Sequence, residues 1–450
     1  MSKVPEKRAI LLTIGTGDVT RAEESLLAPL RKSIRSDGVW SIVVLLPSKI
    51  TNKYAEALQD SLCEFPIEIK PLPEAGMEND IDGCYAHFEA VIAGLLTEGF
   101  RNHDIFVDYT RGTKPMSSAL ALAAVRRDIP NLRYITSDRK DSRGQVVPGT
   151  EEIFTGTTAY VTLQRRLDAA ERFFSRGNFT AVLEILPDPD HRLFESLTPE
   201  PLCGIIGAAH RWARFYAAWD RLDYHGAERL SRRLSTSDVS YPRWAKFAPR
   251  REMYEWVWRL AKPLPDDCRG KAAHVRGLAV DILANGERRL KGGQLEDACL
   301  RAFRVLELIG QIRLFDRGYD SAKLDPKDEI IQRVRMKRRE RNNSSFTERK
   351  DKKTGETFYE AGRELVLSLL KELGDPMQRK LSSLATDPLM KAEKRNKSVL
   401  IHGFEPMAQT DSKAMRAFFG ELAALLIEDD KEAMDHLHVA RTLDFSEADT

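Results

Sequence analysis

Residues 1–155 alternate short apolar runs with amphipathic segments, and this alternation limits the folds open to the chain more than any other feature. The apolar runs are nearly continuous, as strands buried on both faces require. They lie at residues 9–15, 40–46, 67–72, 104–109 and 132–136. Helical spacing of apolar residues marks the segments 25–34, 54–62, 85–96 and 116–127. The pattern predicts a mostly parallel sheet with helices on both faces.

Beyond about residue 151 the pattern becomes helical, and strand signals are sparse. Helices are predicted at residues 161–176, 181–185, 205–222, 253–260, 274–290, 295–315, 361–373 and 415–427. Segments 170–186 and 286–303 each read as a helix, a glycine turn and a second helix, which indicates helical hairpins rather than a fixed repeat. We therefore predict an α/β Rossmann-like N-terminal domain and an all-α C-terminal region. The expected domains are 1–155, 156–265 and 266–450.

Composition limits the function classes. The net charge is only +2, so any RNA-binding surface must come from local clusters of basic residues. The basic run 333–353 is either a solvated helix end with a loop or a phosphate-attracting patch. The cysteines are scattered without a CxxC pair, and no HExxH occurs, so we expect free thiols and no metal site. The first apolar run is too short to span a membrane, and we expect a cytoplasmic protein.

Two predicted strand ends carry residues suited to a nucleotide phosphate. Glycines allow close backbone approach, hydroxyls and a lysine supply donors, and the N-terminus of a helix attracts anions. Thr113 is a plausible N-cap and Pro115 suits the first helical turn. An ordinary tight turn and an ordinary capped helix remain the alternatives at this point. The candidate ligand residues are Gly15, Thr16 and Gly17 after the first strand, and Thr110, Arg111, Gly112, Thr113 and Lys114 after the fourth.

A second candidate site lies near the C-terminus. Arg395 and His402 are seven positions apart, a spacing that returns close to the same face of a continuous helix. A histidine can move a proton at neutral pH, and an arginine can offset charge on phosphate oxygens. Asn396 could orient either the histidine or a phosphate oxygen. The pattern is common, however, and a lone histidine near a helix end is more often structural.

Family resemblance joins the two sites. The turn at residues 110–114 resembles the TGGTK-type turn of CARF domains, which are CRISPR-associated Rossmann-like sensors, and the likeness covers residues 8–155. Arg111 departs from this pattern, because the family often has a glycine there. The Arg395–His402 spacing is similar to the R-x(4–6)-H signature of HEPN ribonucleases, and residues 290–315 look like the helical pair of CARF–HEPN proteins. The chain thus resembles the ancillary ribonucleases of type III CRISPR systems.

The resemblance implies a function and its partners. Paired CARF domains of a homodimer would bind a cyclic oligoadenylate of four or six adenylates, and paired HEPN domains would cut single-stranded RNA without a cofactor or a metal. Two alternatives from other classes stay open. One is a nucleotide-sensing regulator whose helical region binds a partner or nucleic acid without cleavage. The other is a small-molecule α/β enzyme, for which Asp108 and Tyr109 at a strand end offer little acid–base chemistry.

Overall fold

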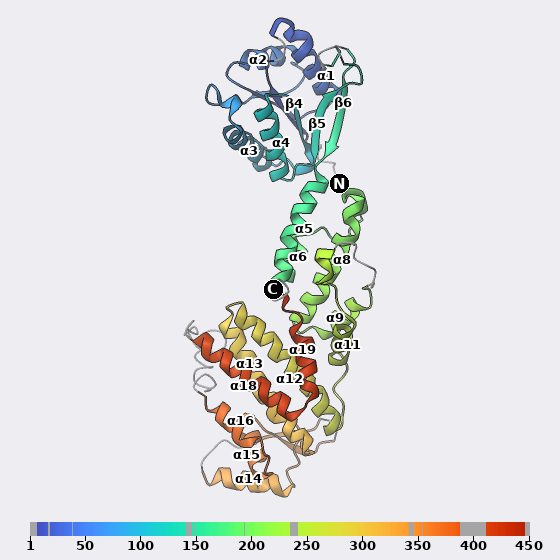
Figure 1. The fold of residues 1–450 in the computed structure, drawn as a ribbon. Coiled ribbons are helices and arrows are strands. Elements are labelled where there is room, and N and C mark those ends of the chain that lie inside the picture. The colour runs from blue at the N-terminus through green and yellow to red at the C-terminus, as the bar shows by residue number, and fades with distance from the viewer. Residues whose placement is uncertain are drawn as a thin grey trace. The chain divides into compact units, whose positions relative to one another are not determined.

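The computed structural model describes residues 7–16, 19–37, 39–140, 146–147, 149–192, 194–234, 242–341, 346–352, 354–387 and 411–445. The chain divides into two compact units (Figure 1). The N-terminal unit comprises Met1–Ala169 and Asp190–Gly204, and the C-terminal unit comprises Ala170–Pro189 and Ile205–Thr450. None of the helices in the described ranges is both long enough and apolar enough to cross a membrane. The predicted division into three domains stays a prediction.

A six-stranded sheet forms the centre of the N-terminal unit, in the order β3-β2-β1-β4-β5-β6. The first five strands are parallel, and β6 pairs antiparallel with β5. The predicted α/β fold with a mostly parallel sheet is confirmed. The strands are β1 Ala9–Ile14, β2 Ile42–Pro47, β3 Ile67–Ile69, β4 Ile105–Arg111, β5 Asn131–Thr136 and β6 Glu152–Thr157.

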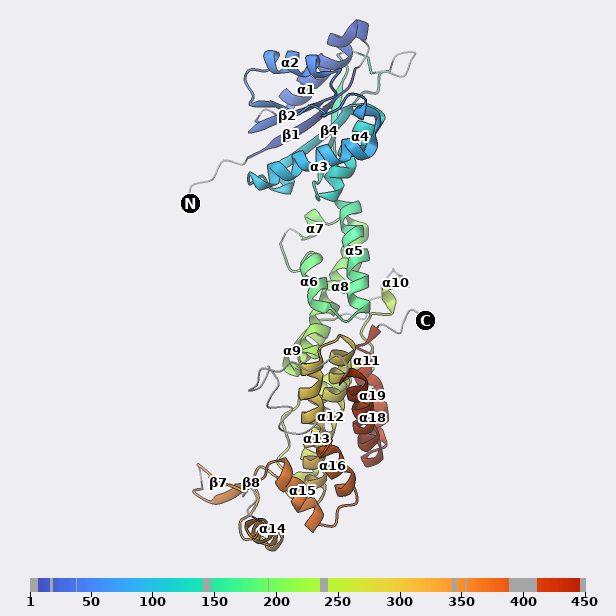
Figure 2. The same ribbon diagram turned by 90° about the vertical axis from the view of Figure 1, so that its left-hand side faces the viewer.

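Helices cover both faces of this sheet (Figures 1 and 2). Helices α1 (Ala28–Ser36) and α2 (Asn52–Ser61) pack on one face, and α3 (Ile81–Thr97) and α4 (Lys114–Arg126) pack on the other. Alternate residues of β1 therefore enter two different cores, and all six are buried. This explains why the strand reads as a continuous apolar run. Short 3-10 or π turns are η1 Val19–Arg21, η2 Glu23–Leu27, η3 Met77–Asn79 and η4 Asn102–Asp104.

Helices dominate the rest of the described chain, as predicted. The first group is α5 Ala159–Ser175, α6 Phe179–Ile185, α7 Phe194–Leu197, α8 Glu200–Asp220, α9 Tyr224–Ser231, α10 Pro242–Ala245 and α11 Arg251–Leu260. The second group is α12 Cys268–Lys291, α13 Leu295–Asp316, α14 Glu329–Arg339, α15 Arg363–Glu372, α16 Gln378–Ala385, α18 Asp411–Asp429 and α19 Glu432–Arg441. Helices α12 and α13 form a long hairpin, and α18 and α19 pack along α12 (Figure 2).

Both predicted helical hairpins are present. Gly177 joins α5 to α6 and Gly293 joins α12 to α13, and both glycines have a positive φ, a conformation that residues with a side chain rarely adopt. Gly286 has another role, because a Cβ atom there would lie only 2.6 Å from the Phe419 ring. The small residue thus lets α18 approach α12 closely.

One element departs from the all-α prediction for the C-terminal region. Strands β7 (Thr347–Lys350) and β8 (Thr357–Glu360) form an antiparallel hairpin at the end of the basic run. All four residues of β7 are exposed, so no apolar alternation marks the strand. The helix before the hairpin fits the solvated-helix interpretation of the run in part, since Lys337 lies 2.7 Å from Glu372 and Arg338 lies 3.1 Å from Glu364.

A buried carboxylate fixes α12 to the preceding helices. The Asp281 side chain is fully buried and accepts hydrogen bonds from the indoles of Trp219 and Trp256, both at 2.9 Å, and from the Tyr224 hydroxyl at 2.8 Å. Burial raises the pKa of the Asp281 carboxyl, while these hydrogen bonds and the charge of Arg288 act in the opposite direction. One side chain therefore satisfies three buried donors from α8, α9 and α11.

The Asp281→Ala variant is expected to lose about 3–5 kcal/mol of unfolding free energy, because it leaves three buried donors without an acceptor. Urea unfolding followed by tryptophan fluorescence measures this loss, and Trp219 and Trp256 report on the site itself. The matched control is Asp281→Asn, which keeps an oxygen acceptor and should lose less than half as much. If the alanine variant unfolds at the wild-type urea concentration, the interaction is not structural.

Candidate functional site

The turn after β4 leads into a capped helix N-terminus. Thr113 is the N-cap of α4, and its hydroxyl accepts a hydrogen bond from the Met116 N–H at 3.3 Å. The same hydroxyl donates to the Glu78 carbonyl at 2.5 Å, which holds the turn against η3. Pro115 lies in the first turn, so the predicted cap is confirmed. Lys114 is exposed at this end of the helix, where the dipole is positive.

Two glycines bring the β1 and β4 ends into backbone contact. The Gly15 N–H donates to the Arg111 carbonyl, and a Cβ at Gly15 would collide with that same oxygen. A Cβ at Gly112 would lie 2.9 Å from the side chains of Thr13 and Met116. The two candidate loops therefore meet at the carboxyl-terminal end of the sheet, as loops after neighbouring parallel strands must. Thr16 is exposed beside them, and Gly17 lies outside the described residues.

The Thr110 side chain forms its hydrogen bonds within the sheet rather than with an open loop. Its hydroxyl donates to the buried Asp108 carboxylate at 2.5 Å and accepts from the Ile135 N–H at 2.9 Å. Asp108 also accepts from the Thr110 N–H at 3.0 Å and from the Ser33 hydroxyl at 2.8 Å. The only hydroxyl proton of Thr110 is thus committed inside the protein. A ligand role for this side chain stays a prediction, and it requires the hydroxyl to change partners.

Arg111 has an unused donor. Its Nε is buried and has no hydrogen-bond partner among the described residues. Burial lowers the pKa of the Arg111 guanidinium, while the charges of Asp108 and Glu151 act to raise it. Burial also acts to raise the pKa of Glu151, but hydrogen bonds from backbone N–H groups and Lys32 outweigh it and lower that pKa. A phosphate oxygen beside Arg111 would satisfy the buried donor and add a favourable charge.

Two further residues lie beside the candidate ligand site, and no sequence pattern predicted them. Thr13, on β1, is fully buried next to Gly112, and its hydroxyl has no partner among the described residues. Glu78 contributes through its backbone carbonyl, to which the Thr113 hydroxyl donates. A carbonyl contact depends on where η3 lies in space and not on the type of side chain. The sequence alone could therefore not indicate it.

The candidate catalytic residues Arg395, Asn396 and His402 lie outside the described residues. Their assignment stays a prediction. The helix that follows them, α18, is firmly anchored: Met415, Phe418 and Leu422 are buried. Buried ion pairs fix its far end, where the Asp429 carboxylate contacts Arg313 at 2.6 Å and Arg276 at 2.7 Å. A well-packed helix thus begins at Asp411, nine residues after His402 in the sequence.

In the described part of the chain, no group of three or more His, Cys, Asp or Glu side chains is arranged so that it could hold a metal ion. All five cysteines are free, as predicted. Cys84 is buried, and burial followed by the charges of Asp80 and Glu78 raises its pKa to about 11. This thiol therefore stays protonated at neutral pH and is a poor metal ligand or nucleophile.

Comparison with known proteins gives a family match and a structural match. Residues 268–426 match the family model of the Csm6 HEPN domain. Csm6 from Enterococcus italicus, solved bound to cyclic hexa-2′-fluoro-hexa-dAMP, is 12% identical in sequence, with 97% of this chain and 99% of that chain covered and a TM-score of 0.55. Can2 from Sulfobacillus thermosulfidooxidans, solved with cyclic tetra-adenylate, is 11% identical over 48% of this chain and 68% of that chain, but its TM-score of 0.22 supports no comparison of folds. No curated protein sequence matches the chain.

The comparisons confirm the resemblance to CARF–HEPN proteins. The Csm6 structure shares its fold with nearly the whole of this chain, from the sheet domain to the helical region. The HEPN match extends from the start of α12 into α18, and its range includes positions 395, 396 and 402.

Proposed function

Starting from a Csm6-type fold and a match to the Csm6 HEPN domain, we propose that this protein is a cyclic-oligoadenylate-activated ribonuclease of CRISPR defence. The observation that carries the proposal is the combination of two features in one chain. The HEPN-matching region begins at residue 268, and a capped, glycine-lined helix N-terminus suited to an anion lies at the carboxyl ends of β1 and β4 in the N-terminal unit. A sensor and a nuclease of these types are joined in the CARF–HEPN proteins that this chain resembles.

The ring ligand binds at the strand ends of the N-terminal unit. Lys114 and the first turn of α4 hold one phosphate, and the buried Nε of Arg111 supplies a donor to the same ligand. Gly15 and Gly112 keep the loop free of side chains that would block the approach. A ring with internal symmetry repeats these contacts on a second copy of the chain, so the active form is a homodimer. The ring has four or six adenylates.

Cleavage uses the 2′-hydroxyl of the RNA as the nucleophile. His402 acts in proton transfer as this oxygen attacks the adjacent phosphorus and the 5′-oxygen leaves, which produces a 2′,3′-cyclic phosphate end. Arg395 stabilises the charge that develops on the phosphate oxygens, and Asn396 orients the histidine or the phosphate. The substrate supplies the nucleophile, so the step requires no metal ion. Single-stranded RNA is the substrate, because its backbone can adopt the in-line geometry.

Incubation of the protein with labelled single-stranded RNA in EDTA, with each cyclic oligoadenylate added in turn, tests the proposal. Cleavage should occur with one ring size, and EDTA should change the rate by less than about twofold, because no step uses a metal. The products should carry 2′,3′-cyclic phosphate ends. Rescue of an EDTA-inhibited reaction by Mg²⁺ or Mn²⁺ would contradict the metal-free mechanism. Ring binding without cleavage under any condition would favour the regulator that binds nucleic acid without cutting it.

A further inference from the structure

Two adjoining cavities lie at the C-terminal end of α12, within the C-terminal unit. The first has a volume of about 540 Å³ and is lined by the α5–α6 turn, the end of α8, the end of α12 and the segment after α19. The second has a volume of about 530 Å³ and lies between α12 and the first half of α18. They share the lining residues Arg288, Lys291 and Asp444, so they adjoin each other, and we call the two together the hollow. Each is large enough for a nucleotide unit.

Cations outnumber carboxylates around this hollow. The carboxylates that line it are Asp220, Glu287 and Asp444. We call the cationic residues the basic groove, and its members are Arg176, Arg288, Arg289, Lys291, Arg416 and Arg441. With six cations and three carboxylates, the lining keeps an excess of positive charge. Polyanions are attracted to such a surface, and their counterions are released on binding.

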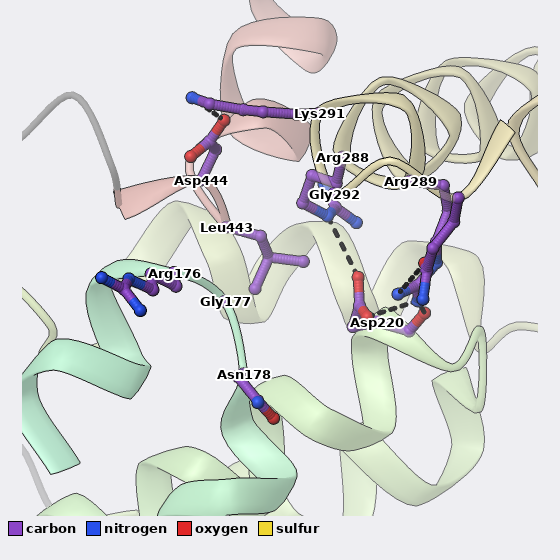
Figure 3. Close-up of a pocket in the computed structure, with 11 residues that line it drawn as sticks. Arg176, Gly177, Asn178, Asp220, Arg288, Arg289, Lys291, Gly292, Leu443 and Asp444 are labelled. Carbon is purple, nitrogen blue, oxygen red and sulfur yellow. Dashed lines mark hydrogen bonds and ion pairs between the residues drawn. The ribbon is translucent and has the colours of Figure 1, made fainter. Parts of the chain in front are cut away.

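A single carboxylate serves two arginines in the first cavity. Asp220 contacts the Arg288 Nε at 3.0 Å and also pairs with the Arg289 Nη2, as Figure 3 shows. One guanidinium charge is therefore not neutralised by this pair of contacts. In addition, Arg288 Nη2 and Arg289 Nε are buried and lack hydrogen-bond partners among the described residues. Unused buried donors are costly, and phosphate oxygens are the acceptors that guanidinium groups match best.

Each of the two cavities is lined by an exposed arginine that the other lacks. Arg176 lies at the α5–α6 turn, and Arg416 lies on α18. No ion pair joins either side chain to another residue in the part of the chain that the structure describes. By contrast, Lys291 pairs with Asp444 at 2.8 Å (Figure 3). Arg441 pairs with Glu287. Arg176 and Arg416 are thus the most available cations for a ligand that passes along the groove.

We propose that the basic groove binds the phosphodiester backbone of the single-stranded RNA substrate. The proposal rests on the ribonuclease function proposed above and assigns the substrate a binding surface outside the catalytic triplet Arg395, Asn396 and His402. Two observations favour RNA over a small anion: the hollow is two adjoining cavities long, and its second cavity borders α18, the helix that begins nine residues after His402. A chain of phosphates fits this length better than a single phosphate does.

The test is RNA binding by the full-length protein in a His402→Ala background, so that the RNA stays intact. Fluorescence anisotropy of a fluorescein-labelled single-stranded RNA is measured over a series of salt concentrations with the ring ligand present. The double variant Arg176→Glu/Arg416→Glu should bind about tenfold more weakly, and its salt slope should fall by about 1.4, since each single-strand contact contributes about 0.7. Both positions are exposed, so the melting temperature should not change.

Arg339→Glu is the matched control, because Arg339 is an exposed arginine at the end of α14, outside the groove. This control should bind RNA as its parent does. If the double variant binds RNA as tightly as its parent does, the groove does not bind RNA. If Arg339→Glu loses as much RNA affinity as the double variant, the RNA lies on the basic run at residues 333–353 instead. AMP is the probe for a small-molecule site: thermal stabilisation by AMP that depends on Arg176 and Arg416, with RNA binding unchanged, would also overturn the proposal.

The cleavage assay separates this proposal from the proposed function. If the protein with an intact His402 cuts RNA but the double variant binds RNA normally, the groove does not bind the substrate, and the ribonuclease function is retained. If the protein cuts no RNA but the double variant loses RNA binding, the groove is a nucleic-acid-binding surface, and the proposed ribonuclease function is wrong.

Discussion

Replacement of His402 by alanine is expected to lower the rate of ring-activated RNA cleavage by about 10³-fold, because proton transfer by a positioned histidine is worth about 10²–10⁴ in rate. Arg395→Ala should lose a similar factor, since removal of one electrostatic donor costs about 10²–10³. The measurement is the initial rate on labelled single-stranded RNA at saturating ring ligand. Binding of the ring should be unaffected in both variants, because their sites belong to different parts of the chain.

His438→Ala is the matched control for this prediction. His438 is an exposed histidine on α19, so its loss should change neither stability nor rate. If His402→Ala cleaves RNA at the wild-type rate, the assigned catalytic segment is wrong, and the search for the catalytic groups moves elsewhere in the HEPN-matching range.

Reversal of the charge at Lys114 is expected to weaken ring-ligand affinity by about tenfold to a hundredfold, because a carboxylate would face the ligand phosphate at the end of α4. The fold should be preserved, since a glutamate at the first position of a helix interacts favourably with the helix dipole. Isothermal titration with the cyclic oligoadenylate measures the affinity directly. The ring concentration for half-maximal RNA cleavage should rise by the same factor, while the rate at saturation stays close to that of the wild type.

Arg126→Glu provides the control for Lys114→Glu. Arg126 is an exposed cation at the opposite end of α4, so it changes the net charge of the domain equally but lies away from the strand ends. Equal weakening in both variants would show that only the overall charge matters. Unchanged affinity in Lys114→Glu would remove α4 from the ligand site.

The sequence predicted the sheet domain well wherever burial decides the pattern. Strand β1 is buried on both faces, and its unbroken apolar run marks it clearly. Strand β6 was missed because it lies at the edge of the sheet and is mostly exposed, with Gly156 and two threonines among its six residues. The β7–β8 hairpin was missed because all four residues of β7 are exposed and Tyr359 is the one buried residue of β8. Periodicity reports contact with a core, so elements without such contact give little signal.

The candidate ligand site was predicted in part. Residue type and order were enough to locate the Thr113 cap and the first turn of α4. They could not show that the Thr110 hydroxyl is committed inside the sheet, because it also accepts from the Ile135 N–H of β5, a strand whose position beside β4 is set by the fold. The basic groove could not be predicted from the sequence either, since Arg176, Arg288 and Arg416 lie far apart in the sequence and are brought together only by helix packing.

Control of RNA cleavage by a ring-binding site in another part of the chain requires that the ligand change the cleavage rate through the paired sensor domains. The most direct measurement is the initial rate of RNA cleavage as cyclic oligoadenylate is titrated into a fixed, high concentration of protein. Almost no cleavage is expected without the ring, and the cleavage rate should rise linearly until one ring is present for every two chains. A rate that is the same with and without the ring, or one that saturates at one ring per chain, would show that a ring shared by paired sensor domains does not control cleavage.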